Sequence, residues 1–142
     1  MEIAEKDVII KYADDKDFLW IIEHDRHISE NILKNKINNN EVYMVKYKGI
    51  TIGWLRYNLF WDHTPFMNMI FFLEEYRRKG IGKILINYWE NEMKKNGYKS
   101  VLTSTNSDEE AQHFYRKMGY TEIGALKWFN EPLEIMSQKI FK

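Results

Sequence analysis

The sequence predicts a layered α/β protein, in which a mixed β-sheet of about seven strands is flanked by about four helices. Three observations predict this class. Short apolar runs typical of strands alternate along the chain with apolar residues at helical spacing. The helical patterns fall between strands and do not gather in one half of the chain. The chain has 142 residues, 44% of them hydrophobic, and only 2 prolines, so we expect residues 1–142 to form a single domain.

The first half of the chain predicts a strand, two helices and a hairpin. An apolar run around Val8 begins the first strand, and Asp14 and Ser29 are residue types that cap helix N-termini. Lys48-Gly49 separates two alternating runs, as a tight turn does. The predicted strands are residues 7–12, 42–47 and 50–57, and the predicted helices are residues 14–24 and 29–38.

The second half predicts the remaining strands and two longer helices. A continuous apolar run over 65–73 indicates a buried strand, and an amphipathic helix over 82–96 ends at the turn Asn96-Gly97. Ser107-x-x-Glu110 has the form of a capping box, which predicts the start of a helix. Gly119 predicts the end of the same helix, because glycine is common directly after the last helical residues. The other predicted elements are strands over 100–104, 120–126 and 133–141 and a helix over 108–118.

Composition excludes several classes of protein. The formal net charge is +0, so the chain lacks the overall basic surface that binds nucleic acid. It contains no cysteine, which excludes disulfides, thiol nucleophiles and cysteine-bound zinc. No apolar run is as long as the roughly 18 residues of a membrane span, and no apolar signal segment follows Met1. We therefore expect a cytoplasmic protein that binds neither nucleic acid nor membranes.

A basic, glycine-containing segment between the 65–73 strand and the 82–96 helix predicts an anion site. Free N–H groups and the positive end of the helix dipole meet at such a helix start. Glycines let a phosphate approach the backbone, and cationic side chains add charge-assisted hydrogen bonds. A solvated basic turn is the alternative interpretation. The segment consists of Arg77, Arg78, Lys79, Gly80, Ile81, Gly82 and Lys83.

The glycine spacing in this segment narrows the choice of ligand. A nucleoside-triphosphate loop needs G-x-x-x-x-G-K-[ST], which the chain lacks, and a dinucleotide fingerprint needs a third glycine where Leu85 stands. The run Arg77-x-x-Gly80-x-Gly82 instead resembles the loop Q/R-x-x-G-x-G/A of the GCN5-related N-acetyltransferases (the GNAT family), which binds the pyrophosphate of acetyl-CoA.

A second motif strengthens this resemblance. The segment from Ala111 to Tyr120, with Phe114-Tyr115 and Gly119 inside it, is similar to the family pattern A-x-x-[FL]-Y-x-x-x-G-[FY]. The resemblance implies a mixed, mostly antiparallel sheet and an acetyl-CoA-dependent N-acetyltransferase. Acetyl-CoA would be the co-substrate, and a primary amine, which we expect to belong to a small molecule, would be the acceptor.

The resemblance also implies roles for individual residues. Ile70, Phe71 and Phe72 would present backbone groups to the pantetheine arm and to the thioester carbonyl, and residues 77–83 would hold the pyrophosphate. Asp108 stands where many relatives carry a cofactor-binding asparagine, and Asn106 is the alternative for that contact.

Tyr115 occupies the place of the family tyrosine that protonates the leaving thiolate, so the resemblance implies a general acid. The same residue also lies on the apolar face of an amphipathic helix, where core packing is the alternative role. A general base is not found, because the 65–73 and 100–104 strands carry no carboxylate. A water chain, or Asp62, Asp25 or Glu74, could take that role.

Two segments rich in aromatic and ionisable residues are expected to face the acceptor, namely 23–27 and 56–64. Tyr57 and Trp61 could hold a cationic amine by cation–π contact, with Asp25 or Asp62 pairing its charge and His27 nearby. A surface loop with an aromatic plug is the alternative. The pairs His24-x-x-His27 and Asp62-His63 could suggest metal ligands, but neither has a third well-spaced ligand. We therefore predict no metal site.

Two other functions stay open from the sequence. Without an assigned base, the domain could bind acyl-CoA as a non-catalytic sensor or regulatory module. Nucleotide binding at the basic segment is a third hypothesis. The apolar C-terminal residues would either complete the sheet or pair two copies, so the sequence allows a monomer or a homodimer.

Overall fold

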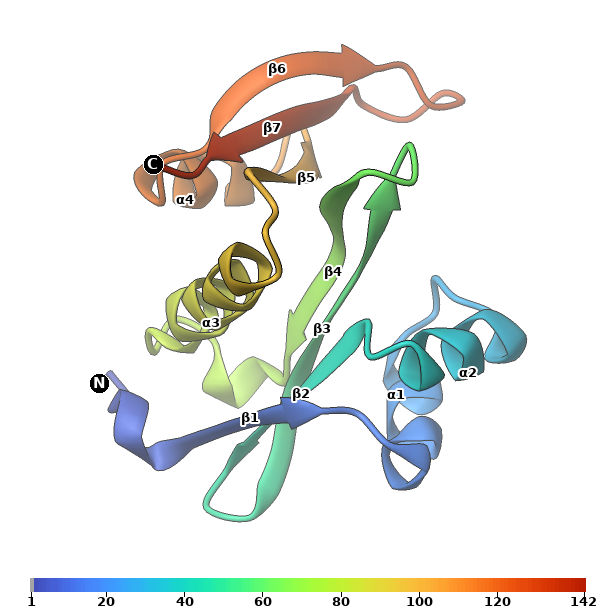
Figure 1. Cartoon of the computed structure of the whole chain (residues 1–142), viewed down its shortest axis with the longest axis vertical. Helices are drawn as coiled ribbons and strands as arrows, with labels where there is room; N and C mark the ends of the chain where they lie inside the picture. The colour runs from blue at the N-terminus through green and yellow to red at the C-terminus, as the bar shows by residue number, and fades with distance from the viewer. Residues whose placement is uncertain (1) are drawn as a thin grey trace. The chain divides into compact units, whose positions relative to one another are not determined.

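The computed structural model describes residues 2–142 and contains the predicted elements in the predicted order (Figure 1). Three short 3₁₀ helices, Glu5–Asp7, Asp15–Asp17 and Glu74–Tyr76, separate longer elements. The helices are α1 (Phe18–His24), α2 (Glu30–Asn38), α3 (Ile81–Lys95) and α4 (Ala111–Lys117). The strands are β1 (Val8–Tyr12), β2 (Val42–Tyr47), β3 (Ile50–Phe60), β4 (Thr64–Phe72), β5 (Ser100–Asn106), β6 (Thr121–Leu126) and β7 (Glu134–Ile140).

Hydrogen-bonded strands follow one another in the order β1-β2-β3-β4-β5-β7-β6, so the predicted mixed sheet is confirmed. The pairs β1/β2, β2/β3, β5/β7 and β6/β7 are antiparallel. The β4/β5 pair is parallel and short, with Phe66 opposite Leu102 and Met67 opposite Thr103. The β5/β7 pair is longer and runs from Ser100 opposite Ile140 to Asn106 opposite Glu134.

The described chain divides into two compact units, and strands β3 and β4 and helix α3 contribute residues to both. The first unit comprises the chain up to Tyr57 together with Met69–Tyr88. The second comprises Asn58–Asn68 and Trp89–Lys142. Each unit is described by itself below.

The core of the first unit forms where α1 and α2 pack beside the sheet (Figure 1). Phe71 of β4 stacks on the buried Trp54 of β3, with ring centroids 4.5 Å apart. Trp20 of α1 meets Trp54 edge-on at 5.8 Å. The buried residues of this core are Ala13, Ile21, Leu33, Ile37, Val42, Met44 and Trp54.

The second unit contains a buried polar network beside its apolar residues. Glu90 of α3, only 2% exposed, accepts hydrogen bonds of 2.8 Å from both the Tyr120 hydroxyl and Lys139 Nζ. Tyr120 stands edge-on to Tyr115 of α4, with ring centroids 5.6 Å apart. Burial is the largest cause that raises the Tyr120 pKa above its usual value, and the adjacent Glu90 charge raises it further. The pair is therefore a neutral phenol bonded to a carboxylate that Lys139 balances.

Local signals placed most boundaries correctly and one wrongly. Lys48 and Gly49 both have positive φ, 50° and 79°, as the predicted tight hairpin requires. Gly119 has φ of 96° directly after α4, which confirms it as the helix stop. The capping box at Ser107 was wrong, because α4 begins at Ala111 and its N-cap Glu110 makes no side-chain cap. The Asn106 amide instead donates to the Glu109 carboxylate at 3.0 Å and holds residues 107–110 in a turn.

Among residues 2–142, no helix has both the length and the apolar character needed to cross a bilayer.

Candidate active site

The segment predicted to bind an anion lies in the first unit, where β4 ends and α3 begins. The chain leaves β4 at Phe72, makes one 3₁₀ turn and enters α3 at Ile81, which is 1% exposed and anchors the helix start in the core. Arg78 and Gly80 have positive φ of 58° and 86°. Gly82 lies in the first turn of α3, whose N–H groups have no partner within the helix. The glycine-containing turn thus leads directly into a helix N-terminus, a place where anions commonly bind.

Arg77 fixes this segment to the end of β4. Its Nε donates a 2.8 Å hydrogen bond to the Phe72 carbonyl, and its guanidinium lies 5.3 Å from the centroid of the Phe71 ring. The Lys79 carbonyl accepts a 2.9 Å bond from the Ile3 N–H, so the segment is held from two sides. Arg78 and Lys83 are exposed and make no side-chain hydrogen bond or ion pair among the described residues, which leaves their charges available to a ligand.

A carboxylate of the chain itself lies beside the segment. A Cβ added at Gly80 would stand 3.7 Å from Cδ and 3.8 Å from Oε2 of Glu2. The Glu2 carboxylate therefore lies next to Gly80. The basic residues of the segment and the positive end of the α3 dipole both favour a negative group at this position.

β3 and β4 approach each other closely at Gly53 of β3 and at Phe71 and Phe72 of β4, just before this segment in the chain. A Cβ at Gly53 would stand 2.3 Å from the Phe71 carbonyl oxygen and 2.5 Å from the Phe72 ring, distances that no side chain tolerates. Only glycine therefore permits the backbone of β4 to take this position at Phe71 and Phe72, where the sequence predicts the pantetheine contact. Ile70 precedes them in β4 and is half-buried.

Tyr115 lies in the second unit, on α4, and is 6% exposed. Burial raises its pKa to about 12, and a hydrogen bond with Thr103 of β5 opposes the increase. The Thr103 hydroxyl in turn donates to the Met67 carbonyl of β4 at 3.2 Å. Tyr115 therefore stays protonated at neutral pH, as a proton donor must. Tyr115 also lies on the buried face of α4, so it packs in the core of the second unit.

The two other predicted cofactor residues of the second unit lie at the end of β5. The Asn106 amide is committed to Glu109, as described above, and Asp108 is exposed in the following turn.

The predicted acceptor residues fall into separate groups. In the first unit, Asp25 is 3% exposed and accepts a 2.8 Å bond from Arg56 Nε and a 3.0 Å bond from the His27 N–H. Its carboxylate is therefore occupied in fixing the loop after α1, while the His27 side chain is exposed. Tyr57 stacks on Tyr43, with ring centroids 6.3 Å apart.

In the second unit, Trp61 and Asp62 form the turn between β3 and β4, with φ of 56° and 58°. Trp61 is 86% exposed and contacts the Phe60 ring at 4.7 Å. Asp62 is exposed beside it. In the first unit, Asp25 and His27 are thus linked by a hydrogen bond. In the second unit, Trp61 and Asp62 are neighbours in one turn.

The first unit contains a cavity that the sequence only partly indicated. Its volume is about 210 Å³, and three of its seven lining residues come from the loop after α1. His24 belongs to the segment 23–27 that was expected to face the acceptor, whereas Trp54 and Met69 were not selected from the sequence, because their periodicity is that of core residues. The lining residues are His24, Asp25, Arg26, His27, Trp54, Met69 and Phe71.

A second cavity of about 400 Å³ lies wholly in the second unit and is mainly apolar. Trp61 is the predicted site residue in its lining, which the β3–β4 turn, β5 and the β6–β7 pair supply. The lining includes Phe60, Trp61, Leu102, Ile123, Leu126 and Met136.

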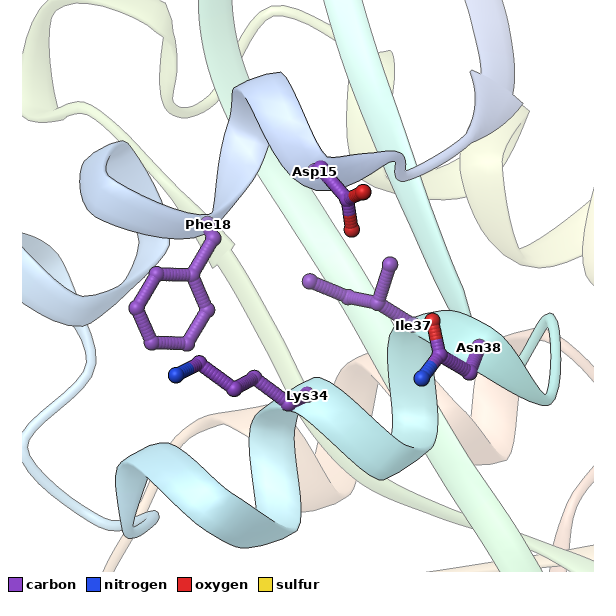
Figure 2. A pocket seen from close by; sticks show the side chains of 5 residues that line it. All are labelled: Asp15, Phe18, Lys34, Ile37 and Asn38. Carbon is purple, nitrogen blue, oxygen red and sulfur yellow. The ribbon is translucent and has the colours of Figure 1, made fainter.

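A third cavity, of about 310 Å³, contains none of the predicted site residues (Figure 2). It lies between the start of α1 and α2 and is lined by Asp15, Phe18, Lys34, Ile37 and Asn38. Lys34 Nζ is 5.2 Å from the Phe18 ring centroid, a contact that stabilises the two helices against each other. The group has no arrangement suited to acyl transfer, so we assign it no catalytic role.

Taken together, the fold, the basic glycine turn at a helix start and the buried tyrosine on α4 define the class of acyl-transferring domains. The sequence matches the acetyltransferase (GNAT) family over residues 7–120, and the chain belongs to that family. The resemblance predicted from the two motifs is therefore confirmed.

Individual relatives agree with this assignment. An uncharacterized N-acetyltransferase of Chlorobaculum tepidum is 28% identical over 97 residues, a match that covers 65% of this chain and 60% of that protein. The match thus spans less than two thirds of the length of the relative.

Solved structures share the fold at low sequence identity. A GNAT family acetyltransferase from Elizabethkingia anophelis, solved with acetyl-CoA bound, superposes with a TM-score of 0.74 at 19% identity, covering 95% of this chain and 99% of that one. A spermidine/spermine N-acetyltransferase from Vibrio cholerae gives 0.76 at 15% identity, with 96% and 94% covered. A ribosomal-protein alanine N-acetyltransferase from Escherichia coli gives 0.75 at 14% identity, with 94% and 93% covered.

Proposed function

We propose that this protein transfers the acetyl group of acetyl-CoA to the primary amine of a small molecule. The observation that carries the proposal is the segment after β4, where Gly80 turns the chain into α3 and Arg77 ties the turn to the Phe72 carbonyl. A pyrophosphate at this helix start would receive main-chain N–H groups and the charges of Arg78 and Lys83. Pantetheine would extend from there along Phe72, Phe71 and Ile70 of β4.

The chemistry requires one proton to leave the acceptor before attack and another to reach the sulfur. The amine nitrogen forms a bond to the thioester carbon, the carbon–sulfur bond breaks, and the thiolate takes a proton. In this proposal Tyr115 gives that proton. Its pKa of about 12 lies above the roughly 8.5 of an ordinary thiol, so Tyr115 passes its hydrogen to the sulfur as it regains one from the nitrogen of the attacking amine.

The sizes of the cavities favour a small acceptor. The two cavities lined by predicted site residues have volumes of about 210 and 400 Å³, each suited to one small molecule or one side chain. An extended peptide would need a longer groove. Trp61 and Asp62 could then contact a cationic amine in the second unit, and His27 and Tyr57 in the first.

Isothermal titration with acetyl-CoA tests the cofactor assignment, with ATP and NAD as controls. We expect micromolar binding that Gly80→Glu abolishes. Gly97→Glu is the matched control, because Gly97 also has a positive φ, 90°, and has open space around it at the other end of α3. Loss of binding in both variants, or binding of ATP in place of acetyl-CoA, would contradict the proposal.

A thiol-release assay then tests the acceptor. Three primary amines cover the relevant classes: n-butylamine, spermidine and a short peptide that begins with alanine. Faster release with n-butylamine or spermidine supports a small acceptor, whereas faster release with the peptide would overturn that part of the proposal.

One observation favours a second function, that of a non-catalytic acyl-CoA sensor. The Asp25 carboxylate is fully engaged by Arg56 and His27, so it offers no base for the amine. Tyr115→Phe separates the two functions. An enzyme loses turnover and keeps acetyl-CoA affinity, while a sensor binds acetyl-CoA and shows no turnover with any of the three amines.

A further inference from the structure

We infer that His24 is the general base that takes the proton from the acceptor amine. This inference rests on the proposed function and supplies the group that the sequence did not reveal. His24 is the last residue of α1, is half-buried, and lines the 210 Å³ cavity of the first unit.

The first step of the argument concerns the tautomer of His24. Its Nδ1 lies 2.7 Å from the Trp20 carbonyl oxygen. A carbonyl oxygen only accepts, so Nδ1 must carry the hydrogen. In the neutral ring Nε2 then holds the lone pair, and this is the nitrogen that can accept a proton from a substrate.

The second step concerns the rigidity of the ring. The His24 ring stacks on Trp20, with centroids 4.1 Å apart and planes at 24°. Trp20 itself packs edge-on against the buried Trp54. A hydrogen bond at one nitrogen and an aromatic face behind the ring hold His24 in one orientation, which a base needs for efficient proton transfer.

The third step concerns what His24 faces. Its ring centroid is 6.3 Å from that of Phe71, on the part of β4 where the thioester is expected. Phe71 and Met69 form the apolar side of the same cavity. An amine with a short apolar stem would place its stem against these side chains and its nitrogen toward the imidazole.

Charged groups around the cavity do not compete for this role. Asp25 is paired with Arg56, and Arg26 and His27 are exposed on the loop. Arg77 lies over the Phe71 ring. Of the seven lining residues, His24 is the one whose geometry leaves a proton-accepting nitrogen fixed and unused among the described residues.

The proton balance of the step is simple. The ammonium form of the acceptor gives one proton to Nε2, which makes the neutral amine and an imidazolium. The amine attacks the thioester carbon, Tyr115 gives its proton to the departing sulfur and regains one from the amine nitrogen, and His24 returns its proton to solvent. One acetyl-CoA and one ammonium thus give an amide, free CoA and one released proton.

The test uses His24→Asn. The asparagine Nδ2 stands where Nδ1 does and still donates to the Trp20 carbonyl, but the variant has no base. We expect acetyl-CoA affinity within about twofold of the parent protein. With the fastest of the three amines, kcat/KM at neutral pH should fall about 100-fold, in the range for loss of a general base. His113→Asn, at an exposed histidine of α4 that lines none of the cavities described above, is the matched control and should leave the rate unchanged.

The pH profile distinguishes a base from a residue that only supports the loop. In the parent protein kcat/KM should level off below the pKa of the free amine, because His24 takes the proton of the ammonium form. In His24→Asn it should rise steadily toward the far higher pKa of the free amine. A lowered rate with an unchanged profile would show a supporting role and overturn the inference.

A measurement on the unaltered protein needs no acceptor. Long-range ¹H–¹⁵N NMR of the four histidines reports which ring nitrogen carries hydrogen. Protonated Nδ1 and bare Nε2 at His24 support the inference, and the opposite tautomer refutes it. If acetyl-CoA fails to bind at all, the proposed function has failed instead, so the two failures are distinguishable.

Discussion

Replacing Arg77 with lysine is the sharpest test of how the segment after β4 is held. The change keeps the positive charge but removes Nε, which donates to the Phe72 carbonyl, and the planar group over the Phe71 ring. A hydrogen bond from a charged donor contributes about 1.5–3 kcal/mol, and an exposed cation–π contact about 0.5–1 kcal/mol. Because Arg77 is exposed, the lower ends apply, and the loss is about 2 kcal/mol.

This loss should appear in ligand binding more than in global stability. The segment lies at the surface, so water can hydrate the Phe72 carbonyl in the variant, and the core residues remain packed. The ligand must then reorder the segment on binding. A cost of about 2 kcal/mol corresponds to an acetyl-CoA dissociation constant raised about 30-fold, since 1.4 kcal/mol is tenfold.

Isothermal titration of Arg77→Lys and Arg78→Lys side by side makes the measurement. Arg78 has the same charge and a neighbouring position, but its side chain makes no hydrogen bond or ion pair within residues 2–142. We expect less than a threefold change for Arg78→Lys. Equal losses in both variants would refute the reasoning, because charge alone and not the tie to β4 would then set affinity.

Three further predictions follow from other contacts. Gly53→Ala should cost about 1–3 kcal/mol of unfolding free energy by urea denaturation and should weaken acetyl-CoA binding, while Gly124→Ala, with open space around it, should do neither. Tyr120→Phe should cost about 1.5–3 kcal/mol, because it removes a buried hydrogen bond to the Glu90 carboxylate, and a cost below 0.5 would contradict that bond. Folding raises the Tyr115 pKa from 10 to about 12, so its contribution to stability is complete below pH 10 and is lost as pH rises through 12. Alkaline spectrophotometric titration should show a late tyrosine step that is missing in Tyr115→Phe.

The parts of the fold that local signals encode were predictable. Lys48-Gly49 and Gly119 must adopt backbone angles that few other residues tolerate, so their positions fixed a hairpin and a helix end. The order of strands and helices followed from periodicity. The two motifs around Gly80 and Tyr115 gave the family, which the match over 7–120 confirmed.

Contacts between distant residues were not predictable, because no local pattern records them. Asp25 looked like a partner for a substrate amine, yet Arg56, 31 positions later, occupies its carboxylate. The role inferred for His24 depends on a carbonyl one turn earlier and on a ring in β4. The false capping box at Ser107 arose in the same way, since the amide of Asn106 captured the neighbouring carboxylate.

The stacking of Trp20 on His24 has a practical consequence for spectroscopy. An imidazolium accepts an electron from an excited indole more readily than a neutral imidazole does, so it quenches indole fluorescence. With ring centroids only 4.1 Å apart, the emission of Trp20 should dim each time His24 gains a proton. The protein thus carries an optical indicator of this one histidine, readable in the absence of any label, acceptor or turnover.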